Sequence, residues 1–298
     1  MSVSVIGSLH LDIMVAAPRL PQRDETLMGT SWHYKCGGKG GNQAVAAAQF
    51  GAATAFGGQV GKDDFGDRLI ANLQAAGVNT DCVETNAGLG SGMSVAITEA
   101  QGEYGAVVVS GANLAIETAD IERRWAKLFR APVLMLQNEI AETVNIAAAR
   151  AAKANGARIV LNAAPARDMS DALLSLVDVL VVNRVEAQML SGSADPEAAV
   201  TALHGPSRDV ILTRGAEGLL ARTRTGAGFS IPSHAVKLVS SHGAGDCFCG
   251  ALAARLAAGD GLQDACRFAN AAAALLVALP DAQRDQLASD AVWSLLSG

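Results

Sequence analysis

An aspartate follows a short glycine-rich turn near the end of the chain, in the stretch HGAGDCFCGAL at 242–252. Small and apolar residues follow Asp246 at helical spacing, so we expect the turn to open a helix. The unpaired amides at the start of a helix attract anions. Asp246 would then either cap its own helix or act as a base beside a bound anion. Alone, the motif favours capping, because short glycine motifs are often only tight connections.

A second glycine-rich stretch, GGKGGNQA at 37–44, lies near the start of the chain. It is not a Walker A loop, because Lys39 is followed by glycine instead of serine or threonine. Neither stretch has the third glycine of a dinucleotide fingerprint, which argues against an NAD-binding dehydrogenase. Lys39 and Asn42 remain as groups that can hydrogen-bond a small polar ligand.

Alternating apolar runs and alanine-rich stretches predict the elements that position these motifs. We expect strands at 2–8, 53–61, 131–137, 157–165, 177–183 and 209–215, and helices at 42–51, 63–77, 142–156 and 196–205. This alternation is typical of a mainly parallel sheet with helices on both faces. Residues 12–36 and 91–109 look extended and lack helices, so we expect them to form a small β-sheet lid on a single domain, 1–298.

Ligands of open parallel sheets bind beyond the carboxyl ends of the strands. The polar and glycine-rich residues that follow the predicted strands are therefore candidates for one site. They are Asp12, the GGKGGN stretch, Glu139, Asn183 with Glu186, Thr213 to Gly215, and Gly243 to Asp246.

Composition excludes several classes of protein. The formal charge of −6 at pH 7 argues against a nucleic-acid-binding surface. Five cysteines without paired spacing indicate reduced thiols and a cytoplasmic location, and the N-terminus has no basic region typical of a secretory signal. The longest apolar run, 271–279, is far shorter than the roughly 20 residues of a membrane span.

The two glycine motifs together, at this separation, resemble those of the ribokinase family of PfkB-type carbohydrate kinases. The stretches GSLHLD, GGQVGKDDFGD, GAN, LNAAPAR, NRVEA, LTRGAEG and FANAAAA fall between or beside them in the family's order. The resemblance covers nearly the whole chain. It implies a three-layer α/β/α fold with a β lid, and transfer of the γ-phosphate of ATP to a primary hydroxyl of a small sugar, with ribose expected.

The resemblance also implies roles for individual residues. Asp246 matches the family's catalytic base, and the amides of Gly243, Ala244 and Gly245 match its anion hole, so the resemblance reverses the preference for capping. The matching sugar-site residues are Asp12, Gly38, Lys39, Asn42 and Glu139. On the nucleotide side, Asn183 and Glu186 match an Asn-x-x-Glu motif that supports Mg²⁺, with Glu186 as the expected ligand. Thr213, Gly215, Gly218 and Asn270 match the phosphate, ribose and adenine contacts.

The chain departs from the family pattern in two places near the reaction centre. Ser240-Ser241-His242 stands where the family usually reads Asp-Thr before the glycine turn. The segment ALPDAQRDQ at 278–286 lacks the glycine of a loop that helps ribokinases bind a monovalent cation. We therefore expect weak or absent dependence on K⁺.

Other departures leave the substrate open. His10 stands where ribokinases often place asparagine, and the aromatic segment 32–34 leads into the glycine loop. A nucleoside kinase or a fructose-type kinase of the same fold stays an alternative, as does a non-catalytic sugar- or nucleotide-binding regulator. We expect the lid's apolar face to pair with a second subunit, forming a homodimer.

Overall fold

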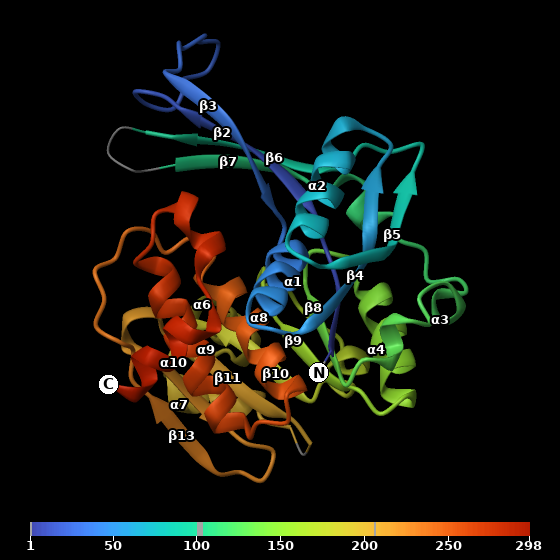
Figure 1. Cartoon of the computed structure of the whole chain (residues 1–298), viewed down its shortest axis with the longest axis vertical. Coiled ribbons are helices and arrows are strands. Elements are labelled where there is room, and N and C mark those ends of the chain that lie inside the picture. Colours follow the sequence, from blue (N-terminus) through green and yellow to red (C-terminus); the bar gives the residue numbers. More distant parts are fainter. Residues whose placement is uncertain (1, 100–103, 206) are drawn as a thin grey trace.

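The computed structural model describes residues 2–99, 104–205 and 207–298. A nine-stranded sheet forms its centre, in the order β13-β12-β11-β10-β9-β8-β1-β4-β5 (Figure 1). All neighbouring pairs are parallel except β11–β12 and β12–β13. The strands are β1 (Ser2–Ile6), β4 (Ala53–Gly61), β5 (Asn79–Asn86), β8 (Val133–Gln137), β9 (Arg158–Asn162), β10 (Val179–Asn183), β11 (Asp209–Thr213), β12 (Leu219–Arg222) and β13 (Gly228–Ile231).

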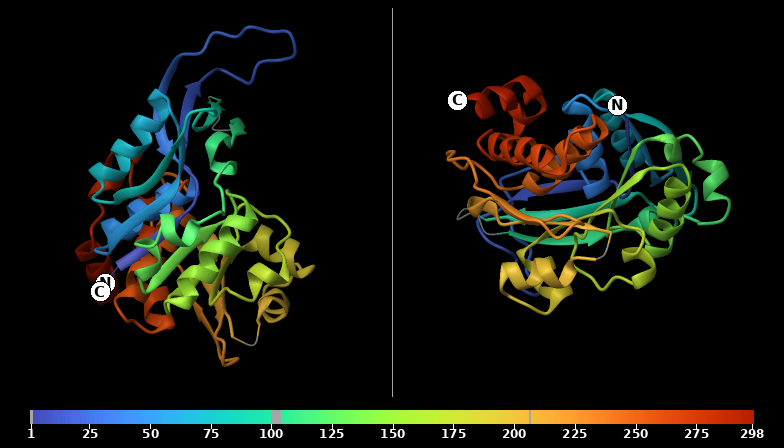
Figure 2. Two further views of the ribbon diagram at one scale, coloured as in Figure 1. Left: turned by 90° about the vertical axis from the view of Figure 1, so that its right-hand side faces the viewer. Right: turned by 90° about the horizontal axis from the view of Figure 1, so that it is seen from below.

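Helices cover both faces of this sheet (Figure 2). One face carries α1 (Lys39–Gln49), α2 (Asp64–Ala75), α8 (Ala244–Ala257), α9 (Leu262–Val277) and α10 (Ser289–Ser297). The other carries α3 (Ile121–Arg124), α4 (Glu142–Ala154), α5 (Asp171–Leu174), α6 (Arg184–Ser191) and α7 (Pro196–Leu203). The predicted three-layer α/β/α fold with a mainly parallel sheet is confirmed.

The hydrophobic core consists of two clusters, one on each face of the main sheet, because side chains along each strand point alternately to the two faces. Val3 and Val5 of β1 belong to the cluster under α1, α8 and α9, whereas Ile6 belongs to the cluster under α4 and α6. Successive side chains of a strand point to opposite faces, so a central strand that is apolar throughout fills both clusters. This double burial fixes the register of the strands, and with it the edge where they end.

A second sheet of four strands, in the order β3-β2-β6-β7, forms the lid. Its strands are β2 (His10–Ala16), β3 (Ser31–Gly37), β6 (Gly92–Thr98) and β7 (Tyr104–Val109). The strands β2 and β3 project as a long hairpin from the main body (Figure 2). The β2 strand begins two residues before the lid boundary predicted at 12, since His10 pairs with both Gly37 and Gly92.

The first helix begins earlier than its sequence pattern indicates. The prediction placed GGKGG in a loop and the helix at 42–51, but α1 spans Lys39–Gln49, so its first turn contains Gly40 and Gly41. Glycine is a poor helix former. Here a Cβ on Gly40 would lie 2.6 Å from the backbone nitrogen of Ser8, so packing against the chain after β1 outweighs the low propensity.

Within the described residues, no helix is long and apolar enough to cross a membrane. The cysteines are all unpaired thiols, and Cys247 and Cys249 are buried on α8 within the core, as expected from their apolar surroundings.

Candidate active site

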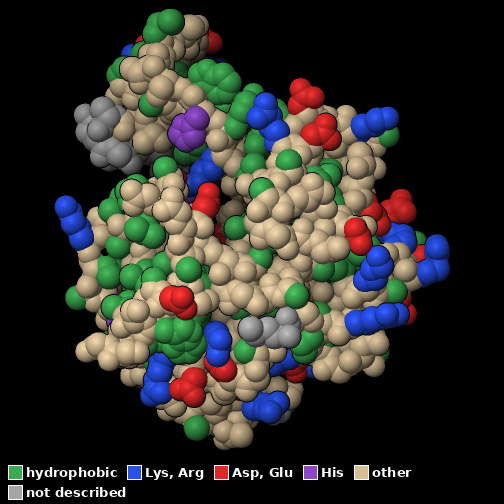
Figure 3. All heavy atoms as spheres, in the orientation of Figure 1, with side chains coloured by type: hydrophobic (Ala, Val, Ile, Leu, Met, Phe, Trp, Pro, Cys, Tyr) green, Lys and Arg blue, Asp and Glu red, His purple; other side chains and the backbone are tan. Residues whose placement is uncertain are grey.

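The site lies where the strand order changes direction. From β1 the chain passes through the lid strands and α1 to β4 on one side, whereas β8 lies on the other side of β1. Loops leaving the carboxyl ends of two such strands diverge and leave a crevice between them. A cavity of about 770 Å³ occupies this place, between the lid and the main body. Figure 3 shows the surface hollowed there, with acidic and basic side chains at the mouth.

Most of the predicted site residues meet in this one cavity. The lining includes residues from the lid, from the first turn of α1 and from the carboxyl ends of the main strands. The predicted residues that line it are His10, Asp12, Gly38, Lys39, Asn42, Glu139, Asn183, Glu186, Thr213, Gly243, Gly245 and Asp246.

Asp246 is held in the cavity by two side-chain amides of α1. Asn42 Nδ2 donates to Asp246 Oδ2 and Gln43 Nε2 donates to Oδ1, each at 3.0 Å. The residue is only 9 % exposed. Burial raises the pKa of this carboxyl above its ordinary value, while the charge of Lys39 and the two amide hydrogen bonds oppose the rise. A carboxylate in such surroundings has a stronger affinity for a proton than one in water.

Close packing of α1 against α8 explains why the two amides reach Asp246. Gly250 of α8 lies at the crossing, and a Cβ there would come within 2.5 Å of the Ala46 Cβ and 2.6 Å of the Gln43 carbonyl oxygen. Only glycine permits that approach. The amide of Gln43 is itself held from behind, since Gln137 Nε2 donates to Gln43 Oε1 at 2.8 Å.

The amides at the start of α8 lack a side-chain cap. The N-cap residue, Gly243, has φ 79°, a left-handed conformation that suits glycine, and among the described residues no side chain accepts a capping hydrogen bond from this helix start. A Cβ built on Gly245 would meet no atom within 4 Å, so its side of the turn is open. The amide of Ala244 donates to the Ser241 carbonyl oxygen at 3.3 Å, and Ala244 does not line the cavity.

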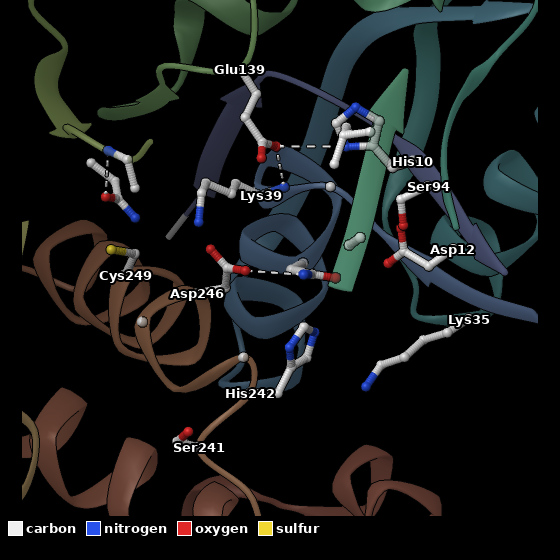
Figure 4. A pocket seen from close by; sticks show the side chains of 18 of the residues that line it. His10, Asp12, Lys35, Lys39, Ser94, Glu139, Ser241, His242, Asp246 and Cys249 are labelled. Carbon is white, nitrogen blue, oxygen red and sulfur yellow. Dashed lines mark hydrogen bonds and ion pairs between the residues drawn. The ribbon is translucent and has the colours of Figure 1, made fainter. Parts of the chain in front are cut away.

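Lys39 projects among three carboxylates. In Figure 4 its side chain lies beside Asp246, with Glu139 on the other side. Burial lowers the pKa of Lys39, but Asp246, Glu139 and Glu186 together outweigh burial and raise it above its ordinary value. The lysine therefore carries a positive charge in the cavity at neutral pH. Glu139 Oε2 accepts a hydrogen bond from the Lys39 backbone amide at 2.8 Å and another from the Ser8 hydroxyl, which ties β8 to the chain after β1.

The lid contributes the opposite wall. Asp12 of β2 accepts a hydrogen bond from the Ser94 hydroxyl of β6, and both line the cavity (Figure 4). His10 is buried, its Nδ1 lies 3.8 Å from Glu139 Oε2, and its Nε2 lacks a hydrogen-bond partner among the described residues. His242 of the segment before α8 also lines this space, and burial, followed by the charge of Lys35, lowers its pKa below the ordinary value.

A second helix start, that of α6, faces the same cavity but is capped by side chains. Asn183 Oδ1 accepts from the Glu186 amide at 3.0 Å, and Glu186 Oε2 accepts from the Asn183 amide at 2.7 Å, which forms a capping box. Asn183 Nδ2 also donates to Glu186 Oε1 at 2.7 Å. Burial raises the pKa of Glu186, and the hydrogen bonds from Asn183 together with the charge of Lys39 oppose that rise.

Four predicted residues do not line the cavity: Ala244, Gly215, Gly218 and Asn270. Gly218 has φ 80°, and a Cβ there would lie 2.0 Å from the Ile231 carbonyl oxygen, so β12–β13 packing by itself requires glycine. The side chain of Asn270 donates to the Pro232 carbonyl oxygen at 2.9 Å. Their roles toward a nucleotide stay predictions.

Several cavity residues were missed in the sequence. Ser94, Lys35 and His242 line the cavity, and Gln43 contacts Asp246 directly. Gln43 follows Asn42 in GGKGGNQA, and the placement of that motif near Asp246 could have pointed to it. Ser94 had no local signal, because only the pairing of β2 with β6 brings it opposite Asp12.

The donor set suits a magnesium ion that arrives with a nucleotide better than a metal held by protein alone. Among the described residues, no group of three or more His, Cys, Asp and Glu side chains is placed to hold a metal. Magnesium usually keeps several waters and needs only one or two carboxylates beside substrate phosphates. Glu186 lines the cavity, and each of its carboxylate oxygens, which accepts one hydrogen bond from Asn183, can accept another, so it fits such a partial role.

Comparisons with known proteins agree with this geometry. Residues 1–288 match the model of the pfkB family of carbohydrate kinases. The chain is 36 % identical over 300 residues to a ribokinase of Bacillus subtilis, with 99 % of each chain covered. It is 32 % identical over 260 residues to a deoxyribokinase of Salmonella typhi, covering 85 % of each. The structure of Arabidopsis thaliana ribokinase with ribose and ATP superposes with a TM-score of 0.92 at 28 % identity, covering 100 % of this chain and 99 % of that one.

Proposed function

The chain belongs to the pfkB family of carbohydrate kinases and is a phosphotransferase with a hydroxyl acceptor, and we propose that it transfers the γ-phosphate of ATP to the primary hydroxyl of ribose. The observation that carries the proposal is the pairing of a buried carboxylate, Asp246, with the uncapped start of α8 in the cavity that Asp12 faces from the lid. A base and an anion site next to each other are what phosphate transfer to a hydroxyl needs.

In this proposal Asp246 accepts the proton of the sugar hydroxyl. The hydroxyl oxygen then forms a bond to the γ-phosphorus, the bond from that phosphorus to the bridging oxygen breaks, and ADP leaves with the electron pair. The amides at the start of α8, of which Gly243 and Gly245 line the cavity, hold the charge that develops on the transferred group. The hydrogen bonds from Asn42 and Gln43 fix the orientation of the Asp246 carboxylate. Each carboxylate oxygen can accept a further hydrogen bond, and in this proposal one of them accepts the proton of the sugar hydroxyl.

The lid and the main body contribute different groups for binding the sugar and balancing charge. On the lid, Asp12 is a carboxylate that can accept hydrogen bonds from two sugar hydroxyls, as Ser94 already shows by donating to it. From the main body, Lys39 brings a positive charge to the space between Asp246 and Glu139. Closing the lid over the sugar would exclude water, which otherwise competes as the phosphate acceptor.

We assign the nucleotide to Asn183, Glu186 and Thr213, the cavity residues at the carboxyl ends of β10 and β11 and the start of α6. A magnesium ion bound with ATP would neutralise phosphate charge there, and Glu186 is the residue that would hold it through water. Gly215, Gly218 and Asn270 extend this assignment toward the ribose and adenine of ATP.

The test is ADP release from MgATP with ribose, deoxyribose, fructose, adenosine and pseudouridine measured side by side. We expect the highest kcat/KM for ribose, with loss of turnover in the Asp246→Asn variant. Preference for deoxyribose would favour the second candidate, which the likeness to a deoxyribokinase supports. Binding of sugar and nucleotide without any turnover would instead favour a regulator.

We also propose a homodimer joined through the lid. Since Asp12, Ser94 and Val108 line the cavity, the residues between them in the strands lie on the other face of the lid sheet. On that face Trp32 is 62 % and Val107 is 68 % exposed. Light scattering should give twice the mass of one chain, and a Val107→Lys variant should shift the protein to monomers.

A cytoplasmic location, where ATP is available, stays a prediction that cell fractionation would test.

A further inference from the structure

Arg284 lies buried beneath the segment that leads into α8. It belongs to the 3-10 helix Asp281–Gln286, and its side chain is 10 % exposed. Its Nη1 donates to the His242 carbonyl oxygen at 2.7 Å and its Nη2 to the Ser240 carbonyl oxygen at 2.9 Å. Its Nε donates to the Leu279 carbonyl oxygen at 3.2 Å. One guanidinium thus joins two segments that are distant in sequence.

Three backbone carbonyl oxygens converging on one place would otherwise suit a monovalent cation, which takes neutral oxygen ligands. Here the positive charge comes from the chain itself. A guanidinium is always protonated and donates in a fixed fork, so it both neutralises and orients the carbonyl groups. Asp281 Oδ1 lies 3.0 Å from Nη1 and supplies a partly exposed counter-charge. The residues present therefore do not fit an added potassium ion at these carbonyl groups.

The clamped segment is the one that sets the start of α8. On its other side, the amides of Val239 and Ser240 both donate to the Val277 carbonyl oxygen at the end of α9, at 2.8 and 3.2 Å. The side chain of Arg284 holds the segment from the carbonyl side at residues 240 and 242. Gly243 follows directly and lines the cavity. A shift of these carbonyl groups would therefore also shift the amides at the start of α8, which in the proposed mechanism face the transferred phosphoryl group.

We propose that Arg284 is a built-in cation that replaces a monovalent metal ion and positions the anion hole, so that the enzyme works without K⁺. The inference rests on the proposed kinase function. Arg284 is a positioning residue, because it contacts the backbone of residues 240 and 242 and does not line the main cavity.

Arg208 provides a matched control elsewhere in the molecule. Its Nε and Nη2 donate to the Leu203 carbonyl oxygen at 3.2 and 2.8 Å, and its Nη1 donates to the Leu174 carbonyl oxygen at 2.8 Å. The same guanidinium-to-carbonyl clamp there ties α5 to α7, away from the cavity lining. Removing it costs comparable hydrogen bonds without touching the start of α8.

The experiment measures kcat and KM for ribose and MgATP in choline chloride, with and without KCl, for the wild type, Arg284→Ala and Arg208→Ala. We expect K⁺ to change the wild-type kcat by less than about twofold. Arg284→Ala should lose about 10- to 100-fold in kcat, since misplacing a catalytic group by about 1 Å has an effect of that size. Guanidinium chloride, well below concentrations that unfold proteins, or KCl should restore at least part of that loss.

Arg208→Ala should lower the melting temperature but gain no response to either cation. The proposal is overturned if the wild type needs K⁺ for activity, or if Arg284→Ala loses activity and neither guanidinium nor K⁺ restores any of it. Arg284→Lys keeps the charge without the fork and should retain intermediate activity, which tests the idea should the alanine variant not fold. A wild type without turnover on any sugar would instead refute the kinase function.

Discussion

Among the helices that begin at the cavity, α6 and α8 differ in how the amides of their first turns are capped. The start of α6 is closed by its own side chains, because Asn183 and Glu186 cap each other's amides. The start of α8 has no side-chain cap. Both helix starts present a positive dipole end. At α6 the positive end of the dipole is covered by side chains that stabilise the helix. At α8 no described side chain covers it, so it is available to a bound anion.

The difference shows how one kind of local structure serves two purposes. Asp246 is the third residue of α8, the place where a carboxylate often turns back to cap its helix. Instead, Asn42 and Gln43 of another helix hold its carboxylate. In the proposed mechanism, this leaves the carboxylate for the reaction and the amides for the transferred phosphoryl group.

The largest expected effect comes from removing the carboxylate at the open start. Asp246→Asn should lower kcat by about 10²- to 10⁴-fold, the usual contribution of a positioned base. The folded-state pKa of Asp246 is raised, so its ionisation costs stability at neutral pH, and that cost disappears as pH falls below the unfolded-state pKa. The variant is spared that cost but loses one of the two hydrogen bonds, because its Nδ2 faces an amide donor, so its melting temperature at pH 7 should stay within about 5 °C of the wild type. A variant that is inactive only because it is unfolded would contradict this interpretation.

Adding a side chain at the uncapped start of α8 should have the next largest effect on kcat. Gly245→Ala adds a methyl group that meets no atom within 4 Å, so the fold tolerates it, and alanine favours the helix. We expect an equal or slightly higher melting temperature and a kcat lower by about tenfold, because the methyl group takes space beside the anion site. Unchanged kcat would show that the transferred group does not approach this turn.

The pH dependence of the rate tests the charges around Asp246. Since the base must be ionised, kcat/KM should fall as pH drops through its raised pKa. Lys39 is the main charge that lowers this pKa. The Lys39→Met variant should therefore lose kcat/KM at a higher pH than the wild type does, in addition to any loss of rate that is independent of pH. Lys127→Met, at an exposed ion pair with Asp81, should leave that pH unchanged. The measurement is a pH–rate profile at saturating MgATP.

The smallest expected effect on the reaction comes from a change at the capped start of α6. Asn183→Ala removes the capping box and should lower the free energy of unfolding by about 1 kcal/mol. It also frees the Glu186 carboxylate, so we expect a severalfold change in the KM for MgATP. Asp195→Ala removes the exposed N-cap of α7, where Asp195 accepts from the Ala198 amide at 2.8 Å. This control should lose similar stability and keep the wild-type KM, and equal KM changes in both variants would break the comparison.

The sequence allowed the fold and much of the site to be predicted, because both depend on local patterns. Apolar strands with helices between them determine a parallel sheet, and the residues after the strands then meet at one edge. The start of α1 was placed wrongly because packing on Ser8 outweighs the low helix propensity of Gly40. Gln43 and Ser94 were missed since their partners come from helix crossing and strand pairing between distant segments. Arg284 was unrecognised for the same reason.

The β2 strand connects the cavity to the outer end of the lid. Its first residue, His10, lines the cavity, and the strand, seven residues long, ends at Ala16. At roughly 3.3 Å per residue it spans about 20 Å, so a rotation of about 10° at its base would move its far end by about 3 to 4 Å. A small adjustment around a bound sugar would thus become a larger displacement at the far end of β2, in the lid through which we propose that two subunits join.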